Sequence, residues 1–230
     1  MTTPIHIISS MATKALLTDL ARMFEKYAPE FVVQVESVGG VDAAKRVQDG
    51  EAFDCVVLAS NAIDNLLEKG KLVQGSRTDL VISNVAVAVP EGVPHPCIDT
   101  EQALKQAVLN AQSIGYSTGP SGVQLIKLFE RWSILNQVQD KLVQAQPGIP
   151  VGTLLAQGKV SLGFQQHSEM IGVSGIEILG TLPDSVQITT IFSAGIASTS
   201  KKPQAVQQLM KYWASANVEA AKLLHGLQTA

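Results

Sequence analysis

The sequence has few of the features that mark several large classes of protein. Of its 230 residues only two are cysteines, Cys55 and Cys97. Two cysteines cannot build the disulfide framework of a small secreted domain, and they do not form a metal-binding pattern. Cys55 belongs to an apolar run and Cys97 follows Pro96 in a loop. We therefore expect a core residue and a loop thiol, without a redox role.

Excess positive charge and long apolar runs are also missing. The 17 Lys and Arg residues are outnumbered by 20 Asp and Glu, for a net charge of −3. Such a chain has no basic field to hold nucleic acid, and no run reaches the roughly 18–20 apolar residues of a membrane span. Residues 1–10 lack the basic and apolar regions of a signal peptide. As written, the sequence predicts a cytoplasmic protein, or a periplasmic one whose signal has been removed.

Cofactor and nucleophile motifs are absent as well. The sequence contains no glycine-rich dinucleotide fingerprint, no phosphate loop ending in Gly-Lys-Ser/Thr and no Gly-x-Ser-x-Gly elbow. His, Cys, Asp and Glu are not grouped at metal-ligand spacings. We therefore expect neither a cofactor nor a metal.

What the sequence does contain is a globular composition and a regular alternation of strands and helices. Hydrophobic residues make up 46% and charged residues 16%, and the length suffices for two α/β lobes. Expected strands alternate with amphipathic helices, which predicts an α/β fold with mixed, mostly parallel sheets and helices on both faces. The strands are expected at 5–8, 31–35 and 55–59, and the helices at 13–27, 42–48 and 63–68.

A cluster of chain breakers suggests where the lobes meet. Pro90, Gly92, Pro94 and Pro96 fall within seven positions. A β-branched run at 187–196 then leads to an amphipathic helix reaching about Leu224. We predict a discontinuous first lobe, 1–88 with 192–230, and a second lobe, 89–191.

The stretch from Ser113 to Val123 carries the clearest local signal for a binding site. A short β run ends in a turn of small residues, and an amphipathic helix begins at once. Ser121 is predicted to be its N-cap, and Ser117 adds a hydroxyl. Free N–H groups and the positive end of the helix dipole favour an anion at such a turn. The alternative is an ordinary capped strand-to-helix connection.

Five stretches in order together resemble a known family. They are Ser9-Ser10-Met11-Ala12-Thr13, Ser37-Val38-Gly39-Gly40, Tyr116 to Val123, Gly163-Phe164-Gln165-Gln166 and Phe192-Ser193-Ala194-Gly195-Ile196. Over nearly its whole length the chain resembles the type II periplasmic solute-binding fold, in its molybdate-binding-protein-like branch. The resemblance implies two lobes that close about a hinge on an anion in the cleft between them. It also implies an ABC transporter as partner if the chain is exported.

The sequence departs from the molybdate binders at the turns that would hold the anion. Met11 stands where the family's first hydroxyl is expected, and Gly40-Val41 where its serine pair is expected; Gln166 lies near the place of its late tyrosine. A tetrahedral oxyanion needs many converging donors. We therefore expect an organic carboxylate rather than molybdate.

The expected ligand-binding residues come from these turns, with one arginine from the hinge approach. Arg77 has the guanidinium fork that suits a carboxylate, and its alternative role is that of an exposed loop arginine. The expected set is Ser9, Ser10, Met11, Gly39, Gly40, Ser117, Ser121, Gly122, Val123, Gln165, Gln166 and Arg77.

Three functions stay open from the sequence. The first is binding of a small anion without chemistry. The second follows from residues 163–166 and 192–196, which look closest to a sub-branch that contains bacterial aconitate isomerase; that resemblance implies an allylic proton shift. Its acid or base candidates are Tyr116, His167 and Glu169, although His167 could be an ordinary cleft histidine and Glu169 a helix-start carboxylate. The third is an intracellular ligand sensor, for which no DNA-binding segment is found.

Overall fold

The computed structural model describes residues 2–146 and 148–230 and divides into two compact units. The first unit extends to Ile82 and resumes at Ile191, and the second comprises Ser83–Thr190. The chain changes unit inside two strands, β4 (Thr78–Pro90) and β9 (Thr189–Ile196), so that each strand contributes residues to both units.

The sheet of the first unit combines parallel strands with an antiparallel one. Its order is β2-β1-β3-β9, in which β1 pairs in parallel with both β2 and β3, and β9 is antiparallel to β3. These strands are β1 (Thr3–Ser10), β2 (Phe31–Val38) and β3 (Cys55–Ala59). Parallel neighbours need crossover connections, which helices α1 and α2 supply.

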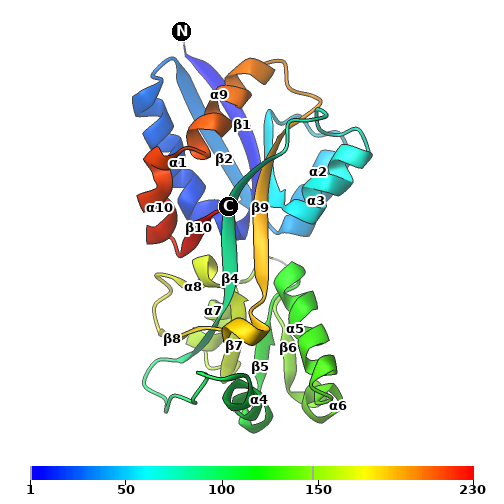
Figure 1. Cartoon of the computed structure of the whole chain (residues 1–230), viewed down its shortest axis with the longest axis vertical. Helices are drawn as coiled ribbons and strands as arrows, with labels where there is room; N and C mark the ends of the chain where they lie inside the picture. Colours follow the sequence, from blue (N-terminus) through cyan, green and yellow to red (C-terminus); the bar gives the residue numbers. More distant parts are fainter. Residues whose placement is uncertain (1, 147) are drawn as a thin grey trace. The chain divides into compact units, whose positions relative to one another are not determined.

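Helices cover both faces of this sheet (Figure 1). Alternation along β3 sends Cys55 and Val57 into one core, shared with α1 and α9, and Val56 and Leu58 into a second core, shared with α2 and α3. The helices and turns are η1 (Met11–Thr13), α1 (Lys14–Tyr27), α2 (Gly40–Gln48), α3 (Ser60–Glu68), α9 (Pro203–Trp213), η4 (Ala216–Val218) and α10 (Glu219–Leu224), and β10 (Leu227–Thr229) follows.

Two expectations for the first unit are wrong in detail. Ser9 and Ser10 are the last residues of β1, not a turn after it, because their register with Ser37 and Val38 of β2 continues the ladder. The C-terminal helix is not continuous either. It stops at Trp213, and the extended backbone of Ser215 starts a new turn that brings both Trp213 and Val218 into the core.

The second unit has its own mixed sheet. Its order is β4-β7-β5-β6, with β5 parallel to β6 and β7 and with β4 antiparallel to β7; β8 also pairs with β4. Val85, Val87 and Val89 of β4 enter one core, and Ala86 and Ala88 enter another. The other strands are β5 (Ile114–Tyr116), β6 (Leu142–Gln144), β7 (Leu162–Gln166) and β8 (Ile176–Thr181).

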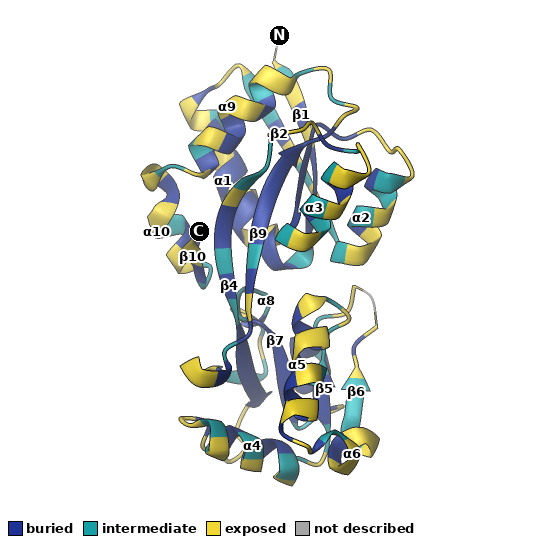
Figure 2. Cartoon of the chain, turned by 45° about the vertical axis from the view of Figure 1, so that its right-hand side comes forward, coloured by how far each residue is buried: buried dark blue, intermediate teal, exposed yellow. Residues whose placement is uncertain are grey.

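The helices of the second unit turn their exposed residues away from this sheet (Figure 2). Helix α5 is typical, since its apolar Leu125, Leu128 and Phe129 join the core with the valines of β4. The helices and turns are α4 (Glu101–Asn110), α5 (Pro120–Arg131), α6 (Leu135–Val138), η2 (Gln139–Lys141), α7 (Val151–Ala156), α8 (His167–Met170) and η3 (Asp184–Val186).

The proline cluster is a loop of the second unit rather than the crossing between units. Strand β4 runs unbroken through the boundary at Ile82–Ser83, and the prolines follow its end at Pro90. The reason is that β-branched and small apolar residues continue the strand to Pro90, so breakers beyond it end a strand already inside the second unit. Within residues 2–146 and 148–230, no helix is both long and apolar enough to span a bilayer.

Candidate functional site

The turn after β5 leads into α5 through small residues. The N-cap of α5 is Gly119, and Pro120 takes the first helical position, where its missing N–H costs nothing. The prediction that Ser121 is the N-cap is therefore wrong, because the fixed φ of Pro120 starts the helix two residues earlier. The Ser121 side chain is buried, and its Oγ lies 3.0 Å from Oγ of Ser117.

The backbone of this turn is packed tightly against the helix start. The N–H groups of Gly122 and Val123 donate to the Gly119 carbonyl at 3.0 and 3.3 Å, so these two predicted ligand donors already have an acceptor. A Cβ on Gly122 would overlap the Ser117 carbonyl oxygen and come within 3.2 Å of the Tyr116 ring. The hydroxyls of Ser117 and Ser121, which are bonded to each other, remain side-chain groups that a ligand at this turn could use.

We expect Ser121→Ala to weaken anion binding by about 1–3 kcal/mol if this hydroxyl pair contacts a charged ligand, and to cost the fold about 1 kcal/mol through the lost bond to Ser117. Thr100→Ala is the matched control, because Thr100 is a true N-cap, accepting from the Ala103 N–H at 3.1 Å. It should cost about 1 kcal/mol of folding without changing affinity. Calorimetric titration and urea unfolding separate the two effects. Equal affinity in both variants would remove this turn from the site.

The end of β7 places two glutamines, Gln165 and Gln166, directly before α8. The Gln165 side chain is buried between two partners: its Oε1 accepts from the Val151 N–H at 2.7 Å, and its Nε2 donates to Glu169 Oε2 at 2.6 Å. Val151 begins α7, so its N–H has no acceptor inside that helix. Gln165 therefore connects the start of α7 to the carboxyl of α8.

Burial perturbs both ionisable groups of α8. It raises the pKa of the Glu169 carboxyl to about 7, and the hydrogen bond from Gln165 offsets only part of that rise. It lowers the pKa of His167. A carboxyl with a pKa near neutral pH is present there in both its neutral and its charged form and can act as acid or base, whereas an exposed glutamate is almost entirely charged.

Gln166 points to the opposite face of the sheet, toward a second polar group. Its Nε2 donates to Thr190 Oγ1 at 2.8 Å, while its Oε1 is buried without a partner in the described part of the chain. Gln166 pairs with Val85, and Ser83 lies two residues earlier on the same face of β4. Ser83 Oγ is also buried without a partner among those residues. Such atoms are where water or a ligand binds.

Ser83 and Thr190 were not among the predicted site residues. Ser83 could have been noticed as a lone hydroxyl in the apolar stretch 80–89, whereas Thr190 is hidden in a β-branched run that reads simply as strand.

The three residues predicted as acid or base do not form one cluster. Tyr116 pairs with Phe164 and packs in the core on that face of the sheet. Glu169 is held by Gln165, whose side chain points to the other face of β7, against α7. In the part of the chain that the structure describes, no hydrogen bond joins Tyr116 to His167 or to Glu169. Of the three, Glu169 is the one that combines a burial-shifted pKa with a hydrogen bond to a buried side chain, Gln165.

In the first unit, three helical segments begin where three parallel strands end. η1 starts at Met11 after β1, α2 at Gly40 after β2, and α3 at Ser60 after β3. The positive ends of α2 and α3 make this edge favourable for negative charge. Ser9 and Ser37 lie side by side there, with 2.7 Å between their Oγ atoms. Ser37 was part of the resembling stretch but was not among the predicted site residues.

Ser10 carries a buried polar group at this edge that has no partner among the residues the structure describes. Its Oγ is buried and, within residues 2–146 and 148–230, makes no hydrogen bond. Gly40 lies against it, since a Cβ on Gly40 would be 3.7 Å from Cβ of Ser10. Gly39, the N-cap of α2, likewise adds no side chain. A buried hydroxyl beside the N-terminus of a helix is suited to bind an anion.

Arg77 is held by two carboxylates of the first unit. Its Nη1 donates to Asp64 at 2.6 Å and its Nε to Asp79 at 3.0 Å, and Asp79 also accepts from Ser193 at 2.6 Å. A guanidinium held in this way would have to leave its partners to reach a ligand. The structure does not bring Arg77 together with the serines of the strand ends by any hydrogen bond between described residues.

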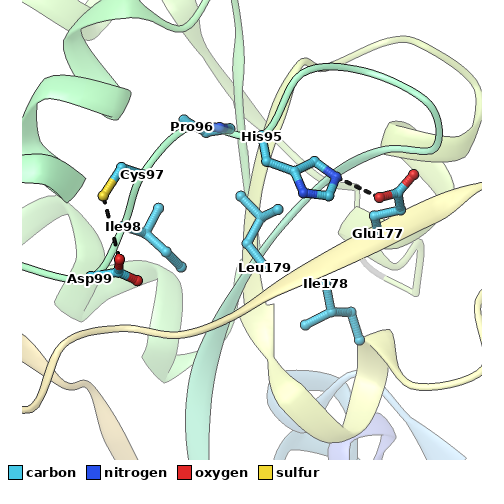
Figure 3. A pocket seen from close by; sticks show the side chains of 8 residues that line it. All are labelled: His95, Pro96, Cys97, Ile98, Asp99, Glu177, Ile178 and Leu179. Carbon is cyan, nitrogen blue, oxygen red and sulfur yellow. Dashed lines mark hydrogen bonds and ion pairs between the residues drawn. The ribbon is translucent and has the colours of Figure 1, made fainter.

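A separate hollow of about 570 Å³ lies on the second unit, near the later part of β4 (Figure 3). Its ionisable side chains are already paired: Glu177 accepts from Gly92 N–H at 2.8 Å and contacts His95, and Cys97 lies 3.6 Å from Asp99. Among the described residues no group of three or more His, Cys, Asp or Glu could hold a metal ion. The hollow is lined by His95, Pro96, Cys97, Ile98, Asp99, Glu177, Ile178 and Leu179.

Comparison with solved structures agrees with this architecture. The periplasmic molybdate-binding protein of Azotobacter vinelandii superposes with a TM-score of 0.81 at 18% identity, covering 97% of this chain and 98% of that one. The sulfate-binding protein SubI of Mycobacterium tuberculosis H37Rv superposes with a TM-score of 0.80 at 14% identity, covering 99% and 87%. The predicted α/β, periplasmic-binding-protein fold is confirmed.

Sequence comparison gives the family. The sequence model described as "Bacterial extracellular solute-binding protein" matches residues 5–228, and the chain belongs to that family. A curated relative, aconitate isomerase of a Pseudomonas species, is 34% identical over 224 residues, covering 95% of this chain and 85% of the relative. The resemblance drawn from the five stretches is therefore confirmed, as is the class of solute-binding protein.

Proposed function

We propose that this protein binds a small organic carboxylate through hydroxyl groups at the carboxyl ends of its strands. The observation that carries the proposal is the Ser10 hydroxyl, buried beside the N-terminus of α2 without a partner in the described chain. An unsatisfied buried hydroxyl costs roughly 1–3 kcal/mol, and a ligand oxygen bound to it would remove that cost. The helix N-terminus favours a negative ligand.

The choice of a carboxylate over a tetrahedral oxyanion rests on how few donors the first unit offers. Met11 and Gly40 carry no donor side chain, and the Ser9 and Ser37 hydroxyls are bonded to each other. A small ion of high charge density needs its whole surface hydrogen-bonded. A carboxylate needs only a few donors at one end, and the rest of an organic ligand can contact apolar groups.

A ligand screen tests this proposal. We expect a tricarboxylate such as cis-aconitate, trans-aconitate or citrate to raise the melting temperature, by the equivalent of about 2.7 kcal/mol at a hundredfold excess over Kd. Sulfate and molybdate should have little effect. Ser10→Ala should weaken the carboxylate by about 1–3 kcal/mol in calorimetric titration, whereas Thr100→Ala should not. Binding of molybdate or sulfate alone would contradict the proposal.

A second candidate function is isomerisation of the bound ligand, as the relative's name suggests. The observation that favours it is Glu169, whose burial raises the pKa of the carboxyl to about 7, a value suited to a general base and acid at neutral pH. In an allylic shift, the carboxylate takes a proton from the saturated carbon beside a double bond. The electron pair of that C–H bond moves the double bond by one carbon, and the proton returns at the far carbon, so no redox partner is needed.

Incubating the protein with cis-aconitate and following trans-aconitate by proton NMR tests this candidate directly. In D₂O the product should carry deuterium if Glu169 exchanges its proton with solvent between the two steps. Glu169→Gln should lower the rate by about 10²–10⁴-fold while the ligand still binds. If the unaltered protein binds cis-aconitate but forms no trans-aconitate, it is a binding protein and the isomerase proposal is excluded.

A further inference from the structure

We infer that Gln165 is a positioning residue: its amide, anchored to the Val151 N–H, holds Oε2 of Glu169 and leaves Oε1 as the oxygen that exchanges a proton with the ligand. This inference deepens the isomerase proposed above and rests on it. It concerns residues of the second unit alone.

The orientation of the Gln165 amide is determined by its partners. The Val151 N–H can only donate, so the atom that lies 2.7 Å from it must be the Gln165 oxygen. The NH₂ end is then directed at Glu169 Oε2, at 2.6 Å. Because the Gln165 side chain is only 3% exposed, it has little freedom to turn away.

The two oxygens of Glu169 consequently differ. Oε2 accepts the hydrogen bond from Gln165. Oε1 accepts no hydrogen bond within residues 2–146 and 148–230. It is also not among the fully buried side-chain atoms without a partner, so solvent can reach it. An oxygen that is accessible and unbonded is the one free to take up or release a proton. Gln165 thus fixes both the direction of the carboxyl and the oxygen that is available.

Few other ionisable groups lie near Glu169 to influence its protonation. The elements in most extensive contact with α8 are β7 and α7, and neither Leu162–Gln166 nor Val151–Ala156 contains an ionisable side chain. Within α8 the other ionisable group is His167, whose own pKa is lowered by burial. Burial is the main cause of the raised pKa of Glu169, and the hydrogen bond from Gln165 lowers that pKa in part.

Gln165→Met is the direct test, because it keeps a side chain of similar length but removes both amide contacts. Carbon-13 NMR of the side-chain carboxyls, with the Glu169 signal assigned by its loss in Glu169→Gln, should show the Glu169 titration midpoint moving upward. With cis-aconitate, kcat should fall about 10–100-fold, as is usual when a group that orients a reacting residue is lost, while KM stays within about threefold. An unchanged midpoint with an unchanged kcat would overturn the inference.

Val151→Pro is the second variant, in case Gln165→Met does not fold. Proline is tolerated at the first position of a helix, and this change removes the N–H that anchors Gln165 while replacing the buried Val151 side chain with another small apolar one. The Glu169 midpoint should move in the same direction by less. The NMR titration needs no turnover. A shifted midpoint in a protein that never isomerises aconitate would reject the isomerase and keep the role of Gln165, whereas turnover with an unmoved midpoint in both variants would reject Gln165 alone.

Discussion

Gly122→Ala is expected to lower the free energy of unfolding by about 3 kcal/mol or more, because the new methyl group meets main chain rather than a flexible side chain. Its Cβ would overlap the Ser117 carbonyl oxygen and would lie 2.9 Å from the Ser117 carbonyl carbon. Neither atom can move without moving the turn between β5 and α5. Overpacking of this kind usually costs about 1–3 kcal/mol, and more when backbone must shift. Urea unfolding measures the loss.

The control lies three residues earlier in the same turn. A Cβ on Gly119 would have only Ser117 Oγ nearby, at 3.8 Å, and the backbone φ of −78° suits alanine. Gly119→Ala should cost about 1 kcal/mol or less, through the weaker N-cap. Equal losses in the two variants would show that Gly122 is not a point of close approach. Because Gly122→Ala displaces the Ser117–Ser121 hydroxyl pair, it should also weaken ligand binding if that pair is used.

Glu169→Gln is expected to stabilise the protein at pH 8 by about 1–2 kcal/mol and to leave its stability at pH 5 nearly unchanged. Burial raises the pKa of the Glu169 carboxyl from 4.5 to about 7. The protonated carboxyl is therefore favourable below about pH 4.5, and its contribution is lost as the pH rises through about 7. The difference between the two pKa values corresponds to at most about 3 kcal/mol of folding free energy. The partial exposure of the Glu169 side chain reduces this amount.

Glutamine has the shape of the neutral acid and can still accept from Gln165, so it removes the cost of the buried charge alone. Urea unfolding at pH 5, 6, 7 and 8 should show the gain growing mainly between pH 5 and 7 and levelling off towards pH 8. Glu68→Gln, at an exposed position near the end of α3, is the control and should show no such trend. A gain that is equal at all four pH values would mean that Glu169 is not titrating in the folded protein near pH 7.

Ligand affinity should also depend on whether Glu169 is protonated. If a carboxylate contacts Glu169, the neutral acid can donate a hydrogen bond to it, whereas the charged form repels it. Affinity should then fall as the pH rises above 7, and Glu169→Gln should remove that dependence.

The architecture was predictable because it depends on local patterns. The apolar run Cys55–Ala59 is typical of a buried strand, and the spacing of apolar residues after Ser121 is typical of an amphipathic helix. Their alternation with small-residue turns implies a parallel sheet whose strand ends bind ligands. The same turns carry the family resemblance, so the class of protein could be inferred without coordinates.

Which of the candidate residues share an environment was decided by tertiary structure alone, because burial and partners come from residues distant in the chain. Arg77 is held by Asp64, thirteen positions away, and the Ser10 hydroxyl loses contact with solvent beside Gly40. Tyr116 and Glu169 look equivalent in the sequence but lie on opposite faces of one sheet. The Glu169 carboxyl acquires its raised pKa only when β7 and α7 enclose it and Gln165 turns its amide toward it. No local pattern encodes that desolvation, since it is a property of the packed unit and not of the segment 165–169.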